Sequence, residues 1–251
     1  VTKTFLCDVL VEATADHGLF SIKDWTRAPD MVSYRPKQQA LTEMIRTSQD
    51  TDYSALYACE QAYWDDIVRD LPPEEFGLIH LLDLHSNLNG CDGVDYIDGI
   101  KRGTSMGFPW RETKRLHLDA LPNNLDKVST TQEIIDRMAH IESEYIAQRR
   151  ACPIFSATLK DEPVSAEKAK IGKTRVFCAA PFDFTLVVRK YLLTCVRVIQ
   201  RNSLTFETAI GVQAQSSEWH GLYDYIVKFG HDRIVCGDYS KFDKRMSPEF
   251  M

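Results

Sequence analysis

Two acidic residues late in the chain have the types and the spacing for metal-assisted phosphoryl chemistry. The apolar run Ile234-Val235-Cys236 predicts a strand over residues 233–238 that ends at Asp238, and Asp243 follows five positions later. A strand-end carboxylate suits Mg²⁺, which prefers carboxylate oxygen and keeps several waters. Two such ions can clamp the attacking and leaving oxygens of a nucleotidyl transfer.

The simpler alternative is a strand that ends in polar turn residues, with Asp243 capping the next helix. On spacing alone this alternative is the better explanation, because two acids five positions apart are common by chance. The flanking residues Gly237, Tyr239 and Phe242 make a chance occurrence of the full pattern much rarer than that of the two acids alone. If residues 239–243 form a tight turn, Asp243 comes back beside the ribose of a bound nucleotide.

A second segment gathers positive charge. Five cations fall within sixteen positions of a chain whose net charge is -6: Lys160, Lys168, Lys170, Lys173 and Arg175. A triphosphate and an RNA backbone both need such a surface. Arg175 opens a predicted strand, which would hold its guanidinium rigid for bidentate phosphate contact, and Gly172 permits the turn before it. The alternative is a solvated hairpin in which three acids partly neutralise the lysines: Asp161, Glu162 and Glu167.

The loop Thr104-Ser105-Met106-Gly107-Phe108-Pro109-Trp110 combines hydroxyls, a glycine and aromatic rings. Cations flank it on both sides: Lys101, Arg102, Arg111, Lys114 and Arg115. This mixture suits a groove for a single-stranded template, because bases stack on rings and phosphates pair with cations. The alternative is an ordinary Gly/Pro turn with Phe108 and Trp110 buried.

Helical periodicity predicts most of the elements around these segments. One helix covers Tyr53–Leu71, a second runs from a Thr130–Glu133 capping box to Arg149, Asp183 caps a third, and Ser216 or Ser217 begins a fourth. The residues expected to face inward are Leu56, Cys59, Tyr63, Ile67 and Leu71; Ile134, Met138, Ile141 and Tyr145; Val187, Tyr191, Cys195, Val198 and Ile199; and Trp219, Leu222, Ile226 and Phe229.

Shorter elements complete the prediction. Short helices are expected over Lys37–Arg46 and Glu74–Leu84, a loop over Asn87–Gly107, and strands over Ile154–Leu159 and Arg175–Ala179. Long helices with few, separated strands give an α+β fold rather than a βαβ alternation. The sequence contains neither a dinucleotide-binding glycine fingerprint nor a phosphate-binding P-loop.

The composition is that of a globular chain and disfavours several classes of protein. Hydrophobic residues make up 44% and charged residues 26% of the 251 residues. The negative net charge argues against a dedicated duplex-binding module, and seven cysteines without a C-x-x-C pair argue against zinc and a disulfide framework. No stretch has the apolar length of a membrane span, and no leader opens the chain. The chain begins at Val1, so we expect it to be cut from a longer protein.

In this order, the three segments resemble the RNA-dependent RNA polymerase of picorna-like positive-strand RNA viruses. Thr104–Pro109 is similar to that family's motif G, T-S-x-G-[YF]-P, and Lys160–Arg175 to its motif F, K-D-E…K-[ST]-R. Asp238–Asp243 is similar to motif A, D-Y-[ST]-x-[FY]-D. The resemblance covers residues 34–251.

The resemblance implies a right-hand polymerase fold. Residues 1–100 would be an N-terminal region that bridges fingers and thumb, and residues 101–190 would be fingers that carry motifs G and F. Residues 191–251 would begin the palm with motif A. Motifs B to E are absent, and no Gly-Asp-Asp occurs, so we expect a fragment that does not polymerise RNA alone.

The resemblance also implies roles for single residues. Asp238 and Asp243 would be the catalytic acids. Asp238 would bind two Mg²⁺ ions, which Mn²⁺ can replace, the Tyr239 backbone carbonyl would bind one ion, and Asp243 would read the ribose 2′-hydroxyl. The nucleotide would also contact Lys160, Lys168, Lys173 and Arg175, and the template would contact Thr104, Ser105, Gly107 and Pro109.

The implied partners are an RNA template and primer, nucleoside triphosphates and the remainder of the viral polymerase or polyprotein. The implied location is the host cytoplasm, in replication complexes. Two alternatives stay open. A reverse transcriptase shares the palm and a motif A acid but commonly has a bulky steric gate where this chain has Asp243. A non-catalytic RNA-binding protein would use only the two basic clusters and would not need Asp238.

Overall fold

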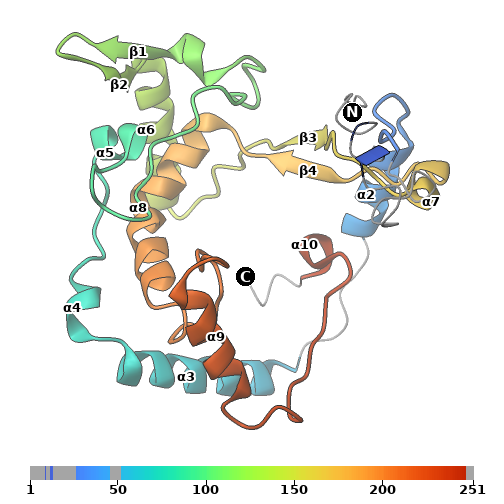
Figure 1. The fold of residues 1–251 in the computed structure, drawn as a ribbon. Coiled ribbons are helices and arrows are strands. Elements are labelled where there is room, and N and C mark those ends of the chain that lie inside the picture. The colour runs from blue at the N-terminus through green and yellow to red at the C-terminus, as the bar shows by residue number, and fades with distance from the viewer. Residues whose placement is uncertain (1–8, 10–11, 14–26, 46–51, 247–251) are drawn as a thin grey trace. The chain divides into compact units, whose positions relative to one another are not determined.

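The computed structural model describes residues 9, 12–13, 27–45 and 52–246, and Figure 1 shows the course of the chain. The chain divides into two compact units, each built from segments that are far apart in sequence. The smaller unit contains residues 1–49, 155–179 and 240–251, and the larger contains residues 50–154 and 180–239. No helix among the described residues combines the length and the apolarity needed to cross a bilayer.

The larger unit is mainly helical. Its α-helices are α3 (Tyr53–Asp70), α4 (Pro73–Phe76), α5 (Leu84–Asn89), α6 (Gln132–Ile146), α8 (Phe182–Arg201) and α9 (Ser217–Val227), and η3 (Lys114–His117) is a 3-10 helix. Strands β1 (Leu118–Leu121) and β2 (Asn124–Thr130) pair antiparallel, with Leu118 opposite Thr130 and a register shift after Ala120. The expected α+β mixture of helices and short strands is confirmed.

The main core of this unit lies where α6 and α8 pack side by side (Figure 1). Ile134, Met138 and Ile141 are buried along α6, as the apolar periodicity predicts. The core cluster consists of Leu88, Met106, Val128, Ile134, Met138, Ile141, Phe182, Leu186 and Val187. A second, smaller cluster joins Ile67 and Leu71 to Val198 of α8. Met106, from the loop before β1, is fully buried in the main core and therefore ties that loop to the helices.

Both predicted caps of these helices are wrong. The N-cap of α6 is Thr131, whose side chain makes no capping bond, and Glu133 instead accepts a hydrogen bond from Trp110 Nε1 at 3.2 Å. The N-cap of α8 is Pro181, so Asp183 lies inside the first turn. There a buried carboxylate is stabilised by the positive end of the helix and by Arg137 Nε, 2.8 Å from Asp183 Oδ2.

The helix predicted over Glu74–Leu84 is also wrong. The structure has only the single turn α4, then an extended segment, then α5 from Leu84, which lies partly in the expected loop. Tertiary hydrogen bonds explain the difference, because the extended segment bonds to α8. Thr194 Oγ1 accepts from His80 N at 3.2 Å and donates to His80 O at 2.7 Å, and Leu82 N donates to Lys190 O at 2.9 Å.

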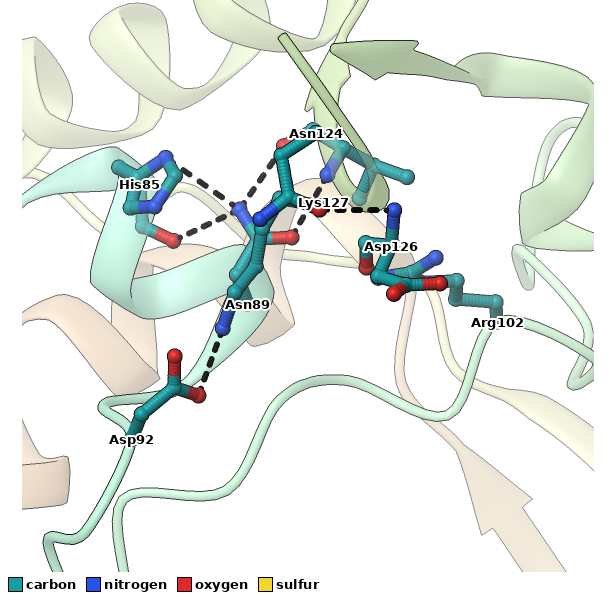
Figure 2. Close-up of polar contacts among 8 residues, drawn as sticks. His85, Asn89, Asp92, Arg102, Asn124, Asp126 and Lys127 are labelled. Atoms are coloured by element: carbon teal, nitrogen blue, oxygen red, sulfur yellow. Dashed lines mark hydrogen bonds and ion pairs between the residues drawn. The ribbon is translucent and has the colours of Figure 1, made fainter.

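Figure 2 shows how α5 is joined to β2. The Asn89 carboxamide acts like a neighbouring strand: Asn89 Nδ2 donates to Val128 O at 2.9 Å, and Asn89 Oδ1 accepts from Val128 N at 2.7 Å. Lys127 Nζ lies 2.7 Å from Asp92 Oδ1, and Arg102 Nη2 donates to Asp126 O at 2.5 Å. Side chains at both ends of the loop 90–101, Asn89 and Arg102, and Asp92 within it are therefore bonded to β2, and this loop leads directly to Thr104.

Several residues predicted to face inward are exposed. Cys59 and Tyr63 lie on the exposed part of α3, while Ile67 and Leu71 are buried. Tyr145 of α6 and Tyr191 of α8 are 45% and 42% exposed. Trp219, Ile226 and Phe229, which were expected on the inner face of the fourth helix, are exposed as well. Periodicity identified the helices correctly, but it cannot say how much of an apolar stripe this chain covers.

The smaller unit contains α2 (Arg35–Met44), β3 (Ser156–Leu159), α7 (Ala166–Lys170), β4 (Val176–Ala179) and α10 (Phe242–Arg245). Both predicted strands form, β3 beginning two residues later than predicted, and they pair as an antiparallel hairpin with Ser156 opposite Ala179 and Leu159 opposite Val176. α2 packs on both strands and on α10, and Lys241 forms an ion pair with Glu43.

Candidate active-site segments and their family

The motif G loop, Thr104–Pro109, is held by its backbone in the larger unit. Met106 N donates to Glu112 O at 2.7 Å, and Met106 O accepts from Phe182 N, the first residue of α8, at 2.8 Å. Met106 and Phe182 are both fully buried. The Met106–Phe182 bond therefore fixes the loop to one of the best-buried points of the unit.

Gly107 occupies a position that only glycine tolerates well. Its φ is 77°, and a Cβ built on it would lie 2.9 Å from Ala180 O and 2.9 Å from Pro181 Cα. Ser105 Oγ accepts a hydrogen bond from Gly107 N at 3.1 Å, and the Phe108–Pro109 peptide bond is cis. Ser105, Phe108 and Pro109 are exposed, and their contact with template stays a prediction.

The Thr104 hydroxyl is used inside the loop. It donates to Lys101 O at 2.7 Å and accepts from Lys114 Nζ at 2.5 Å. Burial lowers the pKa of Lys114, whose Nζ also lies 5.5 Å from the centre of the Phe182 ring. These contacts show that the Thr104 hydroxyl stabilises the loop. Its contact with template stays a prediction.

Trp110 and Phe108 differ in burial. Trp110 packs against the main core and Arg137 lies 4.7 Å from its ring centre, whereas Phe108 is 38% exposed. The simple-turn alternative expected both rings buried; Trp110 is partly buried, and the alternative is wrong for Phe108. Arg137 therefore supports both Trp110 and Asp183, a link that the spacing of these residues in the sequence did not reveal.

The motif F arm, Lys160–Arg175, belongs to the smaller unit, and its two ends are brought together. β4 begins one residue later than predicted, at Val176, but the ladder continues past it because Lys160 N donates to Arg175 O at 2.9 Å. Glu162 lies beside both cations: its Oε2 is 2.7 Å from Lys160 Nζ and its Oε1 is 3.3 Å from Arg175 Nη1. The hydrogen bond from Lys160 lowers the pKa of the Glu162 carboxyl.

The remaining cations of the arm lie on and after α7. Ser165 caps this helix by accepting from Lys168 N at 3.3 Å, and Lys173 N donates to Lys168 O at 2.8 Å. Lys168, Lys170 and Lys173 are all exposed. Gly172, with φ 64°, makes the predicted turn. The exposed lysines fit both the cationic surface and the solvated-hairpin alternative, and Glu162 partly neutralises the arm as that alternative expects.

Residues before α2 are hydrogen-bonded to the motif F arm. The sequence did not predict this contact. Arg27 and Val164 form a two-bond antiparallel bridge, with Arg27 N donating to Val164 O at 2.6 Å and Val164 N to Arg27 O at 3.0 Å. Thr174 Oγ1 donates to Asp30 O at 2.9 Å. Residues 27–30 read Arg-Ala-Pro-Asp, and Pro29-Asp30 signals a local turn but gives no sign of a partner more than a hundred positions away.

The strand predicted over residues 233–238 does not form in this chain. Residues 234–239 are irregular, and residues 231–240 are all exposed, with Val235 97% exposed. A strand needs a neighbour to satisfy its backbone, and within the described residues no other segment pairs with this one. Asp238 is exposed, and its role as a metal ligand stays a prediction.

Asp243 lies within the one-turn helix α10, whose N-cap is Lys241 with φ 60°. The alternative in which Asp243 caps the next helix is therefore wrong. The Asp243 side chain lies outside the described part of the chain.

The oxygen atoms offered by residues 238 and 239 are of the type that divalent metal ions bind. The exposed carboxylate of Asp238 and the backbone carbonyl of Tyr239 are the oxygen ligands that Mg²⁺ takes, with water and substrate phosphate completing its shell. In the described residues, no three His, Cys, Asp or Glu side chains form a group that could hold a metal ion. This segment therefore offers part of a ligand set.

Comparison with known proteins places these segments in one family. Residues 25–251 match the family model of viral RNA-dependent RNA polymerase. The RNA1 polyprotein of Cowpea mosaic virus (strain SB) is 32% identical over 194 residues, which is 75% of this chain and 10% of that polyprotein. The RNA1 polyprotein of Andean potato mottle virus is 27% identical over 235 residues, which is 90% of this chain and 31% of the other.

A solved structure has the same fold. The Sicinivirus 3Dpol RNA-dependent RNA polymerase superposes with a TM-score of 0.64 at 19% identity, over 82% of this chain and 42% of that one. The chain thus spans less than half of this polymerase and about a tenth of the Cowpea mosaic virus polyprotein. Its fold is part of a right-hand polymerase, and members of the family generally use divalent metal ions. The chain belongs to the viral RNA-dependent RNA polymerases, with relatives among picorna-like viruses.

Proposed function

We propose that these residues are the fingers and the beginning of the palm of an enzyme that copies RNA from an RNA template. The whole enzyme would join nucleoside triphosphates to an RNA 3′-hydroxyl and release pyrophosphate. Residues 1–100 bridge fingers and thumb, residues 101–190 are fingers, and residues 191–251 open the palm. The observation that carries the proposal is the family match over residues 25–251, which contains the three motif segments in order.

Each segment has a role in that reaction. Asp238 and the Tyr239 carbonyl hold the divalent ions, a pair of Mg²⁺ for which Mn²⁺ can substitute, and these ions supply charge stabilisation at the transferring phosphate. Asp243 reads the ribose 2′-hydroxyl. Lys160 and Arg175 contact the triphosphate, and Lys168 and Lys173 line its path. Ser105, Gly107 and Pro109 guide the template, and Thr104 supports them. Catalysis rests on positioning and electrostatics.

Residues 1–251 alone are proposed to be inactive, since no Gly-Asp-Asp segment is present to supply further acids. The remainder of the polymerase or polyprotein, together with RNA template and primer, completes the site. Replication complexes in the host cytoplasm are the proposed location. Template-dependent incorporation by residues 1–251 in a primer-extension assay would contradict the inactivity.

The decisive experiment is primer extension by the longer polymerase polypeptide that contains this chain. Asp238→Asn removes the proposed metal ligand without changing side-chain size, and we expect at least about a 1000-fold loss of rate. Asp232→Asn is the matched control, because Asp232 is an exposed acid in the same segment. Equal rates for the two variants would refute the role of Asp238.

Asp243→Ala separates the RNA polymerase from a reverse transcriptase. If Asp243 reads the 2′-hydroxyl, the variant loses selectivity for ribonucleotides over deoxyribonucleotides, measured as the ratio of kcat/KM for the two. An unchanged ratio would remove Asp243 from the ribose site.

A further inference from the structure

Glu162 has an unusual place on the motif F arm. One carboxylate oxygen lies 2.7 Å from Lys160 Nζ and the other lies 3.3 Å from Arg175 Nη1. The Glu162 side chain is 25% exposed, less than those of Lys160 at 44% and Arg175 at 73%. One acid therefore faces both cations at the end of the hairpin.

The backbone fixes this arrangement. Lys160 N donates to Arg175 O at 2.9 Å, which places the two cations opposite each other just beyond β3 and β4. Glu162 N donates to Lys160 O at 3.1 Å, so a tight turn returns the carboxylate toward the hairpin end. The three charges are held by local bonds inside the smaller unit.

The chemistry of the contact imitates a phosphate. Two carboxylate oxygens, each facing a separate cation, reproduce what two oxygens of a phosphate group would do between a lysine and an arginine. Lys160 and Arg175 are the cations proposed above to contact the triphosphate. They cannot serve Glu162 and a triphosphate at full strength together.

We propose that Glu162 occupies the anion position of the motif F arm until the triphosphate of an incoming nucleotide displaces it. This inference rests on the proposed function. Glu162 is then a positioning residue that holds the two cations side by side and weakens nucleotide affinity, because each binding event exchanges one anion for another. Its removal strengthens nucleotide binding without changing the chemical step.

The test is Glu162→Gln in the longer polymerase polypeptide. The change keeps the size of the side chain and removes its charge. We expect KM for nucleoside triphosphate to fall about 3- to 10-fold, the effect of one charge at a solvent-exposed site, with kcat within about twofold. Glu162→Asp retains the charge and should restore KM to near the wild-type value.

Glu167→Gln is the matched control. Glu167 lies in the first turn of α7 on the same arm, is exposed, and takes part in none of the ion pairs seen between described residues. The Glu167→Gln variant should leave KM within about twofold of wild type. The comparison distinguishes an effect specific to the place of Glu162 from the general loss of one negative charge. An equal fall in KM for Glu162→Gln and Glu167→Gln would overturn the inference.

Direct binding provides a readout without catalysis. Inorganic tripolyphosphate, titrated by calorimetry into residues 1–251 without metal, should bind about 3- to 10-fold more tightly to Glu162→Gln than to the unchanged protein. Unchanged or weaker binding, or an unchanged or higher KM in an enzyme that extends primers, would overturn the role of Glu162. If Glu162→Gln tightens tripolyphosphate binding in residues 1–251 as expected, but the unchanged longer polypeptide extends no primer, the result counts against the proposed function instead.

Discussion

Helix α8 and the segment 231–240 both contain apolar runs, yet they have opposite environments. α8 is fixed at its first residue by the bond from Phe182 N to Met106 O and at its last by Arg201, whose Nη2 lies 2.9 Å from Glu75 Oε1. Every residue of the segment 231–240 is exposed. The difference teaches that an apolar sequence favours burial, but that the segment is buried only where another segment packs against it.

The segment needs a different kind of partner from the helix. A helix satisfies its own backbone, so α8 forms wherever one face is covered. A strand satisfies its backbone only through a neighbour, and the described part of the chain supplies none to Val235, which is 97% exposed. We therefore expect the strand to form when the longer polymerase supplies that neighbour.

Hydrogen exchange tests this contrast with the largest expected effect. The amides of Ile234 to Asp238 donate no hydrogen bond among the described residues, whereas the Met106 and Phe182 amides donate at 2.7 and 2.8 Å. In residues 1–251 we expect the latter pair to be protected at least about 100-fold more than the former. In the longer polymerase the segment should gain protection, and its failure to do so would end the strand prediction.

Gly107→Ala should weaken the anchored side of the comparison. The substitution places a methyl group 2.9 Å from the backbone of Ala180 and Pro181 at a φ of 77°. We expect the free energy of unfolding, measured by denaturant titration, to fall by about 2–4 kcal/mol.

Gly103→Ala provides the control for this change. Gly103 lies in the same loop without a left-handed φ, and a Cβ placed on it would have its nearest neighbour in the Arg115 side chain, at 3.8 Å. Its substitution should change stability by less than about 0.5 kcal/mol. Equal losses at the two positions would show that the backbone of Gly107 is not special.

Glu75→Gln sharpens the comparison at the other end of α8. Hydrogen bonds from Arg201 lower the pKa of Glu75 below its ordinary value of 4.5, so its stabilisation is complete above that pH and is lost as pH falls through the lowered pKa. Arg201 is partly exposed, so screening limits the pair to about 1 kcal/mol at neutral pH.

The measurement is the difference in unfolding free energy between the unchanged protein and Glu75→Gln from about pH 3 to about pH 7. This range includes the titration of the Glu75 carboxyl. The difference should shrink on the acidic side. A difference that stays constant through this range would mean that the Glu75 charge does not contribute.

Thr104→Val has the smallest expected effect. It removes the hydroxyl that joins Lys101 O to Lys114 Nζ, and a loss of about 1 kcal/mol in unfolding free energy is expected. Thr104→Ser should keep most of the stability, and Thr113→Val is a matched control, because Thr113 is exposed and makes no side-chain cap bond to η3. If Thr113→Val costs as much, the Thr104 hydroxyl does not support the loop.

Particular elements show how far the sequence could be followed. α3, α6, α8 and α9 were predictable because long apolar periods are local signals, and Ser216 marks the start of α9, although the caps predicted for α6 and α8 were wrong. The extended segment before α5 was not, since its bonds to Thr194 and Lys190 join residues more than a hundred positions apart. Strands β3 and β4 were predictable, and their support by Arg27 and Asp30 was not.

The sequence by itself determined the family, the order of the three motif segments and the kinds of chemistry that they offer, because residue type and spacing carry that information. Tertiary structure alone decided which donors are engaged: the Thr104 hydroxyl within its loop, Asp183 with Arg137, and Glu162 with two cations. It also decided that Asp238 stays exposed. The physical reason is that hydrogen bonding and burial depend on groups that meet only when distant parts of the chain fold together.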